Sequence, residues 1–278
     1  MIESGNFARW ARCVLALPFA MLVPLFVTGC GTLGNGRGWG QDALCPLDAK
    51  RIARAACDAF FDWQTLVPLA GAAVFSIDDF DDRVSDWAAR ESPIFGSVDS
   101  ARNTSDSLVT ALQIEALATA LVTPSGDDPQ QWAFSKAKGL GVEFAAVGAT
   151  GGVTSLLKVA TGRRRPDGSN NRSFPSGHAS SAFSAMTLSN RNLDSIDLDR
   201  HVRSGLKIGN AVMAAGVAWA RVEGERHYPS DVLVGAALGH FLTAFIHDAF
   251  LNLPEDSNVG FAVFSAEGGG GMELSFCF

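Results

Sequence analysis

The chain has 278 residues, of which 47% are hydrophobic and 18% are charged, and its net charge is −7. This length suits one medium-sized domain, and the composition is apolar for a soluble protein but within the range of a helical bundle with a large core. Proteins that bind nucleic acid need a basic surface, so the acidic balance argues against nucleic acid as a partner. The run Arg163–Arg165 is therefore interpreted as a local anion site.

Residues 1–29 have the pattern of a secretory signal. Two arginines precede a nearly unbroken apolar run from Cys13 to Val27, which is too short to favour a stable transmembrane anchor. Small residues then lead to Cys30, and this junction is similar to a bacterial lipobox, in which the cysteine is acylated. An ordinary signal peptide with a chance cysteine is the alternative. Gly31 follows instead of aspartate, which by resemblance to the lipoprotein sorting rule favours the outer membrane, facing the periplasm.

The segment after the signal contains many glycines and few hydrophobic residues. Residues 30–47 are therefore expected to be a flexible tether between the lipid and a domain that covers 48–278. Cys45 and Cys57 are close enough in sequence to form a disulfide in an oxidising compartment, with Cys277 left over, but the spacing does not determine the pairing.

From residue 48 the hydrophobic pattern is helical for most of the chain. The sequence Asp127-Asp128-Pro129 predicts a helix start, because an acidic cap precedes a proline in the first turn. After the signal we find no uninterrupted apolar run of about 18 residues, so we expect a globular bundle without transmembrane spans. Helices are expected over about 49–63, 65–75, 105–122, 129–160, 176–188, 199–220 and 229–250, and a further helix is expected to begin at about residue 78.

The last twenty or so residues change to a period of two. Hydrophobic residues alternate on both sides of Gly268–Gly271, a pattern typical of a β-hairpin with a glycine turn. Two strands cannot close a barrel. The expected fold is therefore an all-α bundle with a C-terminal hairpin at about 258–278.

Three short segments in the second half carry residues that suit a phosphate site. They supply permanent cations, two imidazoles and a carboxylate, and all lie near expected helix ends. The residues are Lys158 and Arg165-Pro166 in the first segment, Pro175-Ser176-Gly177-His178 in the second, and Arg221, His227 and Asp231 in the third.

The order and spacing of these residues resemble the type 2 phosphatidic acid phosphatase and vanadium haloperoxidase superfamily. The family pattern is Lys, six residues, Arg-Pro; then Pro-Ser-Gly-His; then Arg, five residues, His, three residues, Asp. The resemblance covers residues 158–231 and implies a helical bundle with phosphatase activity. Members usually have serine before the arginine of the third motif, where this chain has Ala220. We expect this change to remove a supporting hydrogen bond and to leave the reaction intact.

The resemblance also implies a role for each residue. His227 is the expected nucleophile, which forms a phosphohistidine, and Asp231 would orient its ring and stabilise the imidazolium. His178 would protonate the leaving oxygen as general acid and later help to activate water.

The remaining motif residues are expected to bind the phosphate. Lys158, Arg165 and Arg221 would surround its oxygens. The backbone N–H groups of Ser176 and Gly177 lie at an expected helix start, which favours anions.

These residues predict a metal-independent phosphatase, without a cofactor, that acts on phosphomonoesters or diphosphates. Lipid phosphates are the favoured substrates, because a lipid anchor raises the local concentration of a membrane substrate. The alternatives are a general periplasmic acid phosphatase acting on soluble monoesters, a vanadium-dependent haloperoxidase, and a binding lipoprotein that has lost turnover. A zinc site is not expected from the ligand spacing, and the other histidines, His201, His240 and His247, are assigned to the surface or the core. The sequence does not determine the oligomeric state.

Overall fold

The computed structural model describes residues 29–43, 49–251, 259–266 and 269–276. The signal before residue 29, Cys45 and Cys277 therefore lie outside the described residues. Cys57 has a free thiol.

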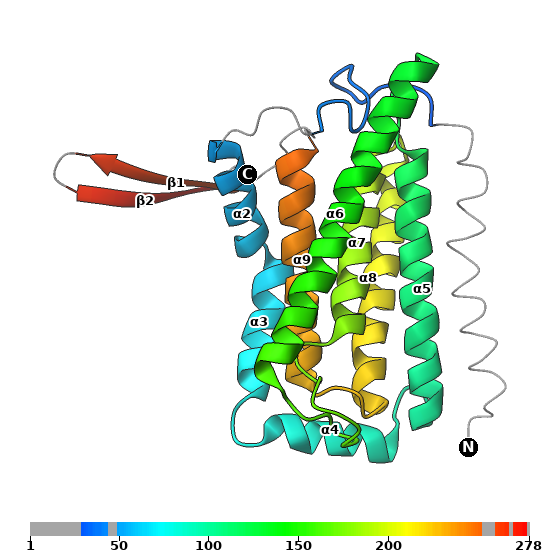
Figure 1. The fold of residues 1–278 in the computed structure, drawn as a ribbon, viewed down its shortest axis with the longest axis vertical. Coiled ribbons are helices and arrows are strands. Elements are labelled where there is room, and N and C mark those ends of the chain that lie inside the picture. Colours follow the sequence, from blue (N-terminus) through cyan, green and yellow to red (C-terminus); the bar gives the residue numbers. More distant parts are fainter. Residues whose placement is uncertain (1–28, 44–48, 252–258, 267–268, 277–278) are drawn as a thin grey trace.

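The described chain is a bundle of long helices, as the sequence predicts (Figure 1). The longest helix begins where it was expected, because the Asp128 side chain accepts hydrogen bonds from the N–H groups of Gln130 and Gln131. It ends at Gly162, whose φ of 54° a glycine adopts without strain. The helices are α2 (Ala49–Phe61), α3 (Trp63–Phe75), α4 (Phe80–Glu91), α5 (Val98–Val122), α6 (Pro129–Thr161), α7 (Gly177–Ser195), α8 (Arg200–Glu223) and α9 (Pro229–Phe250).

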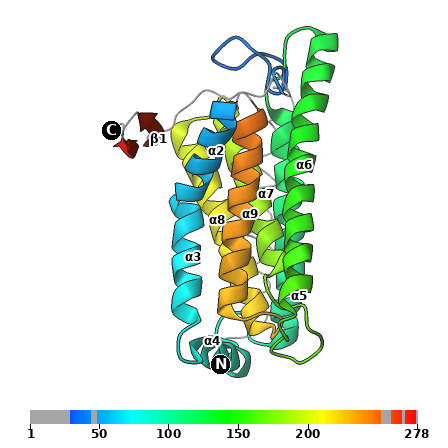
Figure 2. The same ribbon diagram turned by 60° about the vertical axis from the view of Figure 1, so that its left-hand side comes forward.

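Helices α7 and α9 form the centre of the bundle. Helix α7 packs against α5, α6, α8 and α9, and α9 also packs against α2 and α3, which follow one another along the side of the bundle (Figures 1 and 2). Glycines allow the central pair to approach closely, because a Cβ at Gly235 or Gly239 would lie 2.6 Å or 2.3 Å from a carbonyl oxygen of α7. Helix α4 lies across one end of the bundle (Figure 1).

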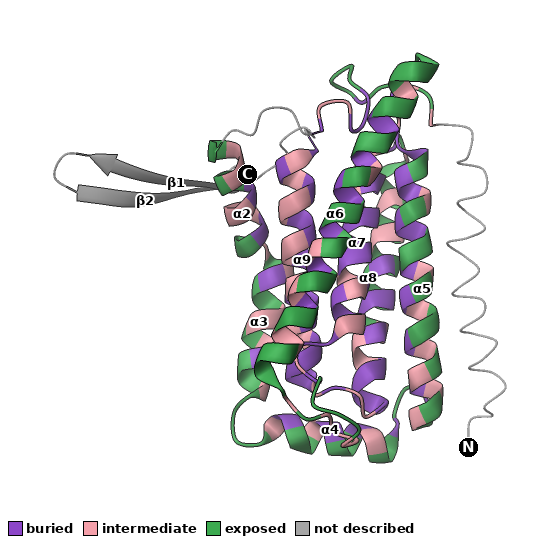
Figure 3. Cartoon of the chain, in the orientation of Figure 1, coloured by how far each residue is buried: buried purple, intermediate pink, exposed green. Residues whose placement is uncertain are grey.

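Several helices expose large hydrophobic side chains, while many of their buried positions hold small or polar residues. Figure 3 shows the buried and exposed stripes along the helices. On α6, Phe134, Phe144, Leu156 and Val159 are each more than three-fifths exposed, with fractions of 72%, 64%, 68% and 72%. Three helices, α5, α6 and α9, are long and apolar enough to cross a membrane.

The expectation that the chain has no candidate spans is therefore wrong. The search for uninterrupted apolar runs missed these helices because serine, threonine, glycine and single charged residues interrupt them. In a bundle such residues turn inward, where other helices satisfy their polar groups, while the outer face stays apolar.

Residues 29–43, which were expected to be part of a flexible tether, pack against the turn between α5 and α6. Gly31 pairs with Gly126 as an isolated bridge, and Trp39 is 0% exposed. A Cβ at Gly139 would lie 2.1 Å from the Trp39 ring. Gly38 and Gly40 allow close packing, because a Cβ at either would lie 2.2 Å or 2.3 Å from a carbonyl oxygen, and burial of Trp39 stabilises the segment.

The C-terminal segment contains two strands, β1 (Val259–Ala266) and β2 (Gly269–Phe276). They pair antiparallel, with Val259 opposite Phe276. The hairpin borders α2 at one end and extends away from the helices (Figure 1).

Candidate active site

The three motif segments meet at the end of the bundle where α6 and α8 end and α7 and α9 begin. In Figure 1 this is the lower end, beside α4. Lys158 lies in the last turn of α6, His178 in the first turn of α7 and Arg221 in the last turn of α8, while Arg165 and His227 lie in the adjoining loops and Asp231 in the first turn of α9.

His227 and Asp231 form a buried pair, with exposed fractions of 1% and 0%. Nδ1 of His227 lies 3.6 Å from Oδ2 of Asp231, which is an ion-pair distance but longer than a normal hydrogen bond. The same Oδ2 accepts hydrogen bonds from Ser173 Oγ at 2.5 Å and from the N–H of Tyr228 at 3.0 Å. The carboxylate is thus held beside the Nδ1 side of the ring.

His227 is neutral at physiological pH. Burial lowers its pKa to about 4, because the charged imidazolium is poorly solvated in the interior. Asp231 opposes this effect, and the cations of Lys158 and Arg221 reinforce it. A neutral imidazole retains the lone pair that a nucleophile needs.

Lys158 ties the loop that precedes α7 to the end of α6. Its Nζ donates to the carbonyl oxygens of Pro175 at 2.6 Å and Arg172 at 2.9 Å. These bonds place the ammonium charge beside the start of α7.

Ser176 has a structural role at the start of α7. Its N–H donates to the carbonyl oxygen of Asp231 at 2.9 Å, so this donor has a partner within the protein, and phosphate binding by Ser176 stays a prediction. Its side chain caps α7 by accepting from the N–H of Ala179. The helix start therefore needs Ser176 for its own geometry. Gly177 begins the helix at the same place, and a Cβ there would lie 3.7 Å from Cε of Lys158.

Arg165 and Arg221 each have a buried Nε with no hydrogen-bond partner among the described residues. Arg191 and Arg203 have the same feature elsewhere in the described chain, so it does not mark the site. The charges of Arg165 and Arg221, which both lower the pKa of His178, are what favours an anion here. Arg221 Nη1 donates to Ser105 Oγ of α5 at 3.0 Å. Ser105 of α5 therefore makes a hydrogen bond with Arg221, the arginine of the third motif, which follows Ala220 in place of the usual serine.

His178 has an acidic partner that the sequence did not reveal. Its Nε2 lies 2.8 Å from Oδ1 of Asp106 on α5, and Asp106 also lies 3.6 Å from Arg221 Nη1. Burial lowers the pKa of His178 and Arg221 lowers it further, while Asp106 raises it. A distance of 72 residues along the chain separates the pair, and no motif surrounds Asp106.

Arg163 connects Asp231 of α9 to Asp81 of α4, an acidic residue that also lies outside the motifs. Arg163 Nη1 donates to Asp231 Oδ1, and its Nη2 donates to Asp81 Oδ2, each at 2.8 Å. Arg163 belongs to the basic run that was interpreted as an anion site, but it contacts two carboxylates of the protein instead. The basic run in the sequence indicates that Arg163 belongs to the site. The two carboxylates that it contacts could not be identified before the fold was known.

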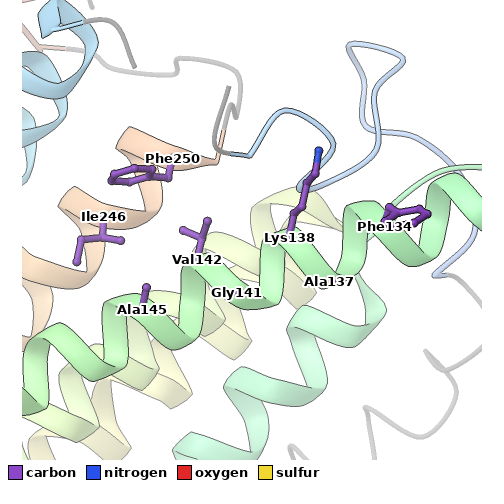
Figure 4. A pocket seen from close by; sticks show the side chains of 8 residues that line it. All are labelled: Phe134, Ala137, Lys138, Gly141, Val142, Ala145, Ile246 and Phe250. Atoms are coloured by element: carbon purple, nitrogen blue, oxygen red, sulfur yellow. The ribbon is translucent and has the colours of Figure 1, made fainter. Parts of the chain in front are cut away.

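No group of three or more His, Cys, Asp or Glu side chains in the described part of the chain could hold a metal ion. An apolar groove with a volume of about 440 Å³ lies between α6 and α9 at the other end of these helices, and no motif residue lines it (Figure 4). The charged site and this groove are therefore separate features.

Comparison with known proteins agrees with this geometry. Residues 140–254 match the family model of the PAP2 superfamily. A segment of 90 residues is 37% identical to a lipid A 1-phosphatase of Porphyromonas gingivalis, and this match covers 32% of the chain but only 19% of that relative.

The fold is similar to a solved structure, the transmembrane PAP2 type phosphatidylglycerolphosphate phosphatase from Bacillus subtilis. The TM-score is 0.50 at 21% sequence identity, and the match covers 69% of this chain and 94% of that one. Residues 140–254 therefore match the PAP2 superfamily, and the chain has a helical fold similar to that of a solved PAP2 structure.

Proposed function

We propose that the chain is a metal-independent phosphatase that hydrolyses lipid phosphates or diphosphates through a phosphohistidine. The observation that carries the proposal is the arrangement around His227: a buried imidazole beside the carboxylate of Asp231 and the cations of Lys158 and Arg221. Phosphoryl transfer needs an in-line nucleophile and positive charge around the transferred group, and both are present here.

In the first step, His227 attacks phosphorus. Since Nδ1 faces Asp231, the attacking atom is Nε2. An N–P bond forms while the bond from phosphorus to the leaving oxygen breaks, and His178 gives its proton to that oxygen. Asp231 stabilises the positive charge that develops on the His227 ring.

In the second step, neutral His178 accepts a proton from water. The water oxygen attacks phosphorus, the N–P bond breaks, and inorganic phosphate leaves while His227 returns to its neutral form. Lys158, Arg165 and Arg221 offset the charge on the phosphate oxygens in both steps, which is work that a divalent metal does in other phosphatases.

The apolar outer faces of α5, α6 and α9 support membrane lipids as the source of the substrate. Both relatives named above act on lipid phosphates according to their descriptions. We also propose that Cys30, which is exposed, is acylated, and that the protein resides in the outer membrane of a bacterial envelope.

The test is a comparison of catalytic efficiency on detergent-dispersed phosphatidate-type lipids and on soluble monoesters. The assays use the purified protein with EDTA and with added vanadate. We expect higher efficiency on the lipids, no loss in EDTA, and inhibition by vanadate, which mimics the five-coordinate transition state. Loss of activity in EDTA that Mg²⁺ or Zn²⁺ restores would contradict metal independence. Equal efficiency on soluble monoesters would overturn the lipid assignment alone.

A further inference from the structure

Arg163 is held on several sides at the start of α9. Its Nη1 donates to Ser230 Oγ as well as to Asp231 Oδ1, at 2.8 Å in both cases, and its Nη2 reaches Asp81. The guanidinium carbon lies 4.1 Å from the centre of the Tyr228 ring, a cation–π contact. Burial lowers the pKa of Arg163, but Asp231 and Asp81 outweigh this effect, so that the net shift is upward.

Asp81 completes the contact from α4. It is 5% exposed, and its Oδ1 accepts a hydrogen bond from the N–H of Ser230 at 2.8 Å. Its Oδ2 accepts from Ser230 Oγ and from Arg163. The two carboxylates of Asp81 and Asp231 therefore share one guanidinium, and the first turn of α9 is held between them.

The two oxygens of Asp231 have different partners. Arg163 contacts Oδ1, while Oδ2 lies toward His227 and accepts from Ser173 and Tyr228. The planar guanidinium gives one nitrogen to each carboxylate, Nη1 to Asp231 and Nη2 to Asp81. Without Arg163, Oδ1 of Asp231 would lose this charged donor, and only the partners of Oδ2 would hold the plane of the carboxyl group beside the imidazole.

We propose that Arg163 and Asp81 are positioning residues that orient Asp231, and through it the His227 ring, for attack on phosphorus. This inference rests on the proposed phosphatase mechanism. Neither residue is expected to contact the substrate, because their hydrogen-bonding groups are committed to the protein.

Residues that only stabilise the fold would make the same contacts. The test must therefore separate a structural role from the positioning of Asp231 and His227. The charged groups that face His227 are Asp231 of α9, Lys158 of α6 and Arg221 of α8. Arg163 neutralises part of the Asp231 charge, and Asp81 draws Arg163 away from it. Loss of Arg163 should therefore make His227 easier to protonate, and loss of the Asp81 charge should make it harder.

The experiment measures kcat, KM and the acid limb of the kcat/KM profile for Arg163→Gln and Asp81→Asn. We expect kcat to fall by about tenfold to 100-fold, as for a small misplacement of a reacting group, with little change in KM or in the affinity for vanadate. The acid limb should move to higher pH in Arg163→Gln and to lower pH in Asp81→Asn. Arg90→Gln, which removes an exposed arginine from α4, the helix that carries Asp81, is the matched control and should leave all of these quantities unchanged.

Shifts in the same direction, or lower kcat with an unmoved acid limb, would overturn the positioning role. Weaker vanadate binding in both variants would also overturn it, because it would mean a general collapse of the site. If Arg163→Gln does not fold, Asp81→Asn still gives a shift with a predicted sign. His227→Ala is measured beside these variants. Activity in His227→Ala would refute the proposed function. If His227→Ala is inactive while the Arg163 and Asp81 variants behave normally, only the positioning role is refuted.

Discussion

Asp106 of α5 and His178 of α7 form a contact of 2.8 Å between Oδ1 and Nε2 at the mouth of the site. The Asp106 side chain is 62% exposed and that of His178 is 36% exposed, so solvent reaches the pair. Asp106 raises the pKa of His178 and offsets part of the lowering by burial and Arg221, although the net shift remains downward. His227 is almost fully buried, whereas His178 has an exposed acidic partner, and this difference in environment suits separate roles as nucleophile and general acid.

Asp106→Asn should therefore shift the alkaline limb of the kcat profile to lower pH. The general acid must be protonated, activity falls as pH rises through the pKa of His178, and Asp106 raises that pKa. The other charged groups that act on His178 are Arg221 and Arg165, and both remain in the variant. A pH–rate series checks the shift. Asp99→Asn is the control, because it removes the same charge from an exposed position on the same helix; an equal shift there would mean a general charge effect.

His227→Ala should lower kcat by about four orders of magnitude or more, since removal of a nucleophile from a group that acts as a unit abolishes the catalysed step. Asp231→Asn should cost less, but still orders of magnitude, because it loses orientation and imidazolium stabilisation together. Single-turnover assays with radiolabelled substrate should detect a phosphoenzyme in the parent protein and none in His227→Ala. His201→Ala, at an exposed position in the first turn of α8, should retain normal activity. Substantial turnover by His227→Ala would exclude the phosphohistidine route.

Trp39→Ala should destabilise the packed segment 29–43 without changing kcat. The side chain is fully buried, and truncation of a buried tryptophan costs about 3–5 kcal/mol. Lys136 Nζ, 5.1 Å from the ring centre, would also lose a cation–π partner. The readouts are thermal unfolding in detergent and the rate of trypsin cleavage at Arg37. Trp63→Ala, at a position that is 69% exposed, is the matched control. Equal behaviour of the two variants would show that Trp39 does not hold the segment.

The sequence was sufficient to predict the residues that gather at the site, because each motif lies where a helix begins or ends. Lys158 and Asp231 are far apart along the chain, and antiparallel packing of α6, α7, α8 and α9 brings their ends together. The start of α6 could be predicted as well, since an acidic cap and a proline act locally.

The partners of these residues could not be predicted. Asp81 and Asp106 lie on α4 and α5, outside any motif, and only tertiary packing brings them to Asp231 and His178. Trp39 illustrates the same limit, because its glycine-rich surroundings have the composition of a linker until a groove at Gly139 receives the ring. The candidate spans were missed for a related reason: a run-length criterion does not register which face of a helix carries the polar residues.

Cys30 and the candidate active site lie at opposite ends of α6. The carbonyl oxygen of Gly29 accepts a hydrogen bond from Trp132 Nε1 near the start of this helix, and Lys158 lies near its end. At about 1.5 Å per residue these two positions are roughly 40 Å apart, which exceeds the hydrocarbon thickness of about 30 Å. If α6 crosses the membrane, the segment with Cys30 and the phosphate site face opposite sides.

This arrangement can be tested with single cysteines at two exposed positions, Asn35→Cys in the packed segment and Asn171→Cys in the loop before α7. A large maleimide that does not cross the outer membrane, applied to intact cells, should label one of the two above the background of the parent protein, and both after permeabilisation. The accessible position identifies the side on which substrate phosphate is cleaved, because Asn171 lies in the same loop as Arg165. Equal labelling of both positions in intact cells would mean that the bundle does not cross the membrane. The apolar faces of α5, α6 and α9 would then need a different partner from a bilayer.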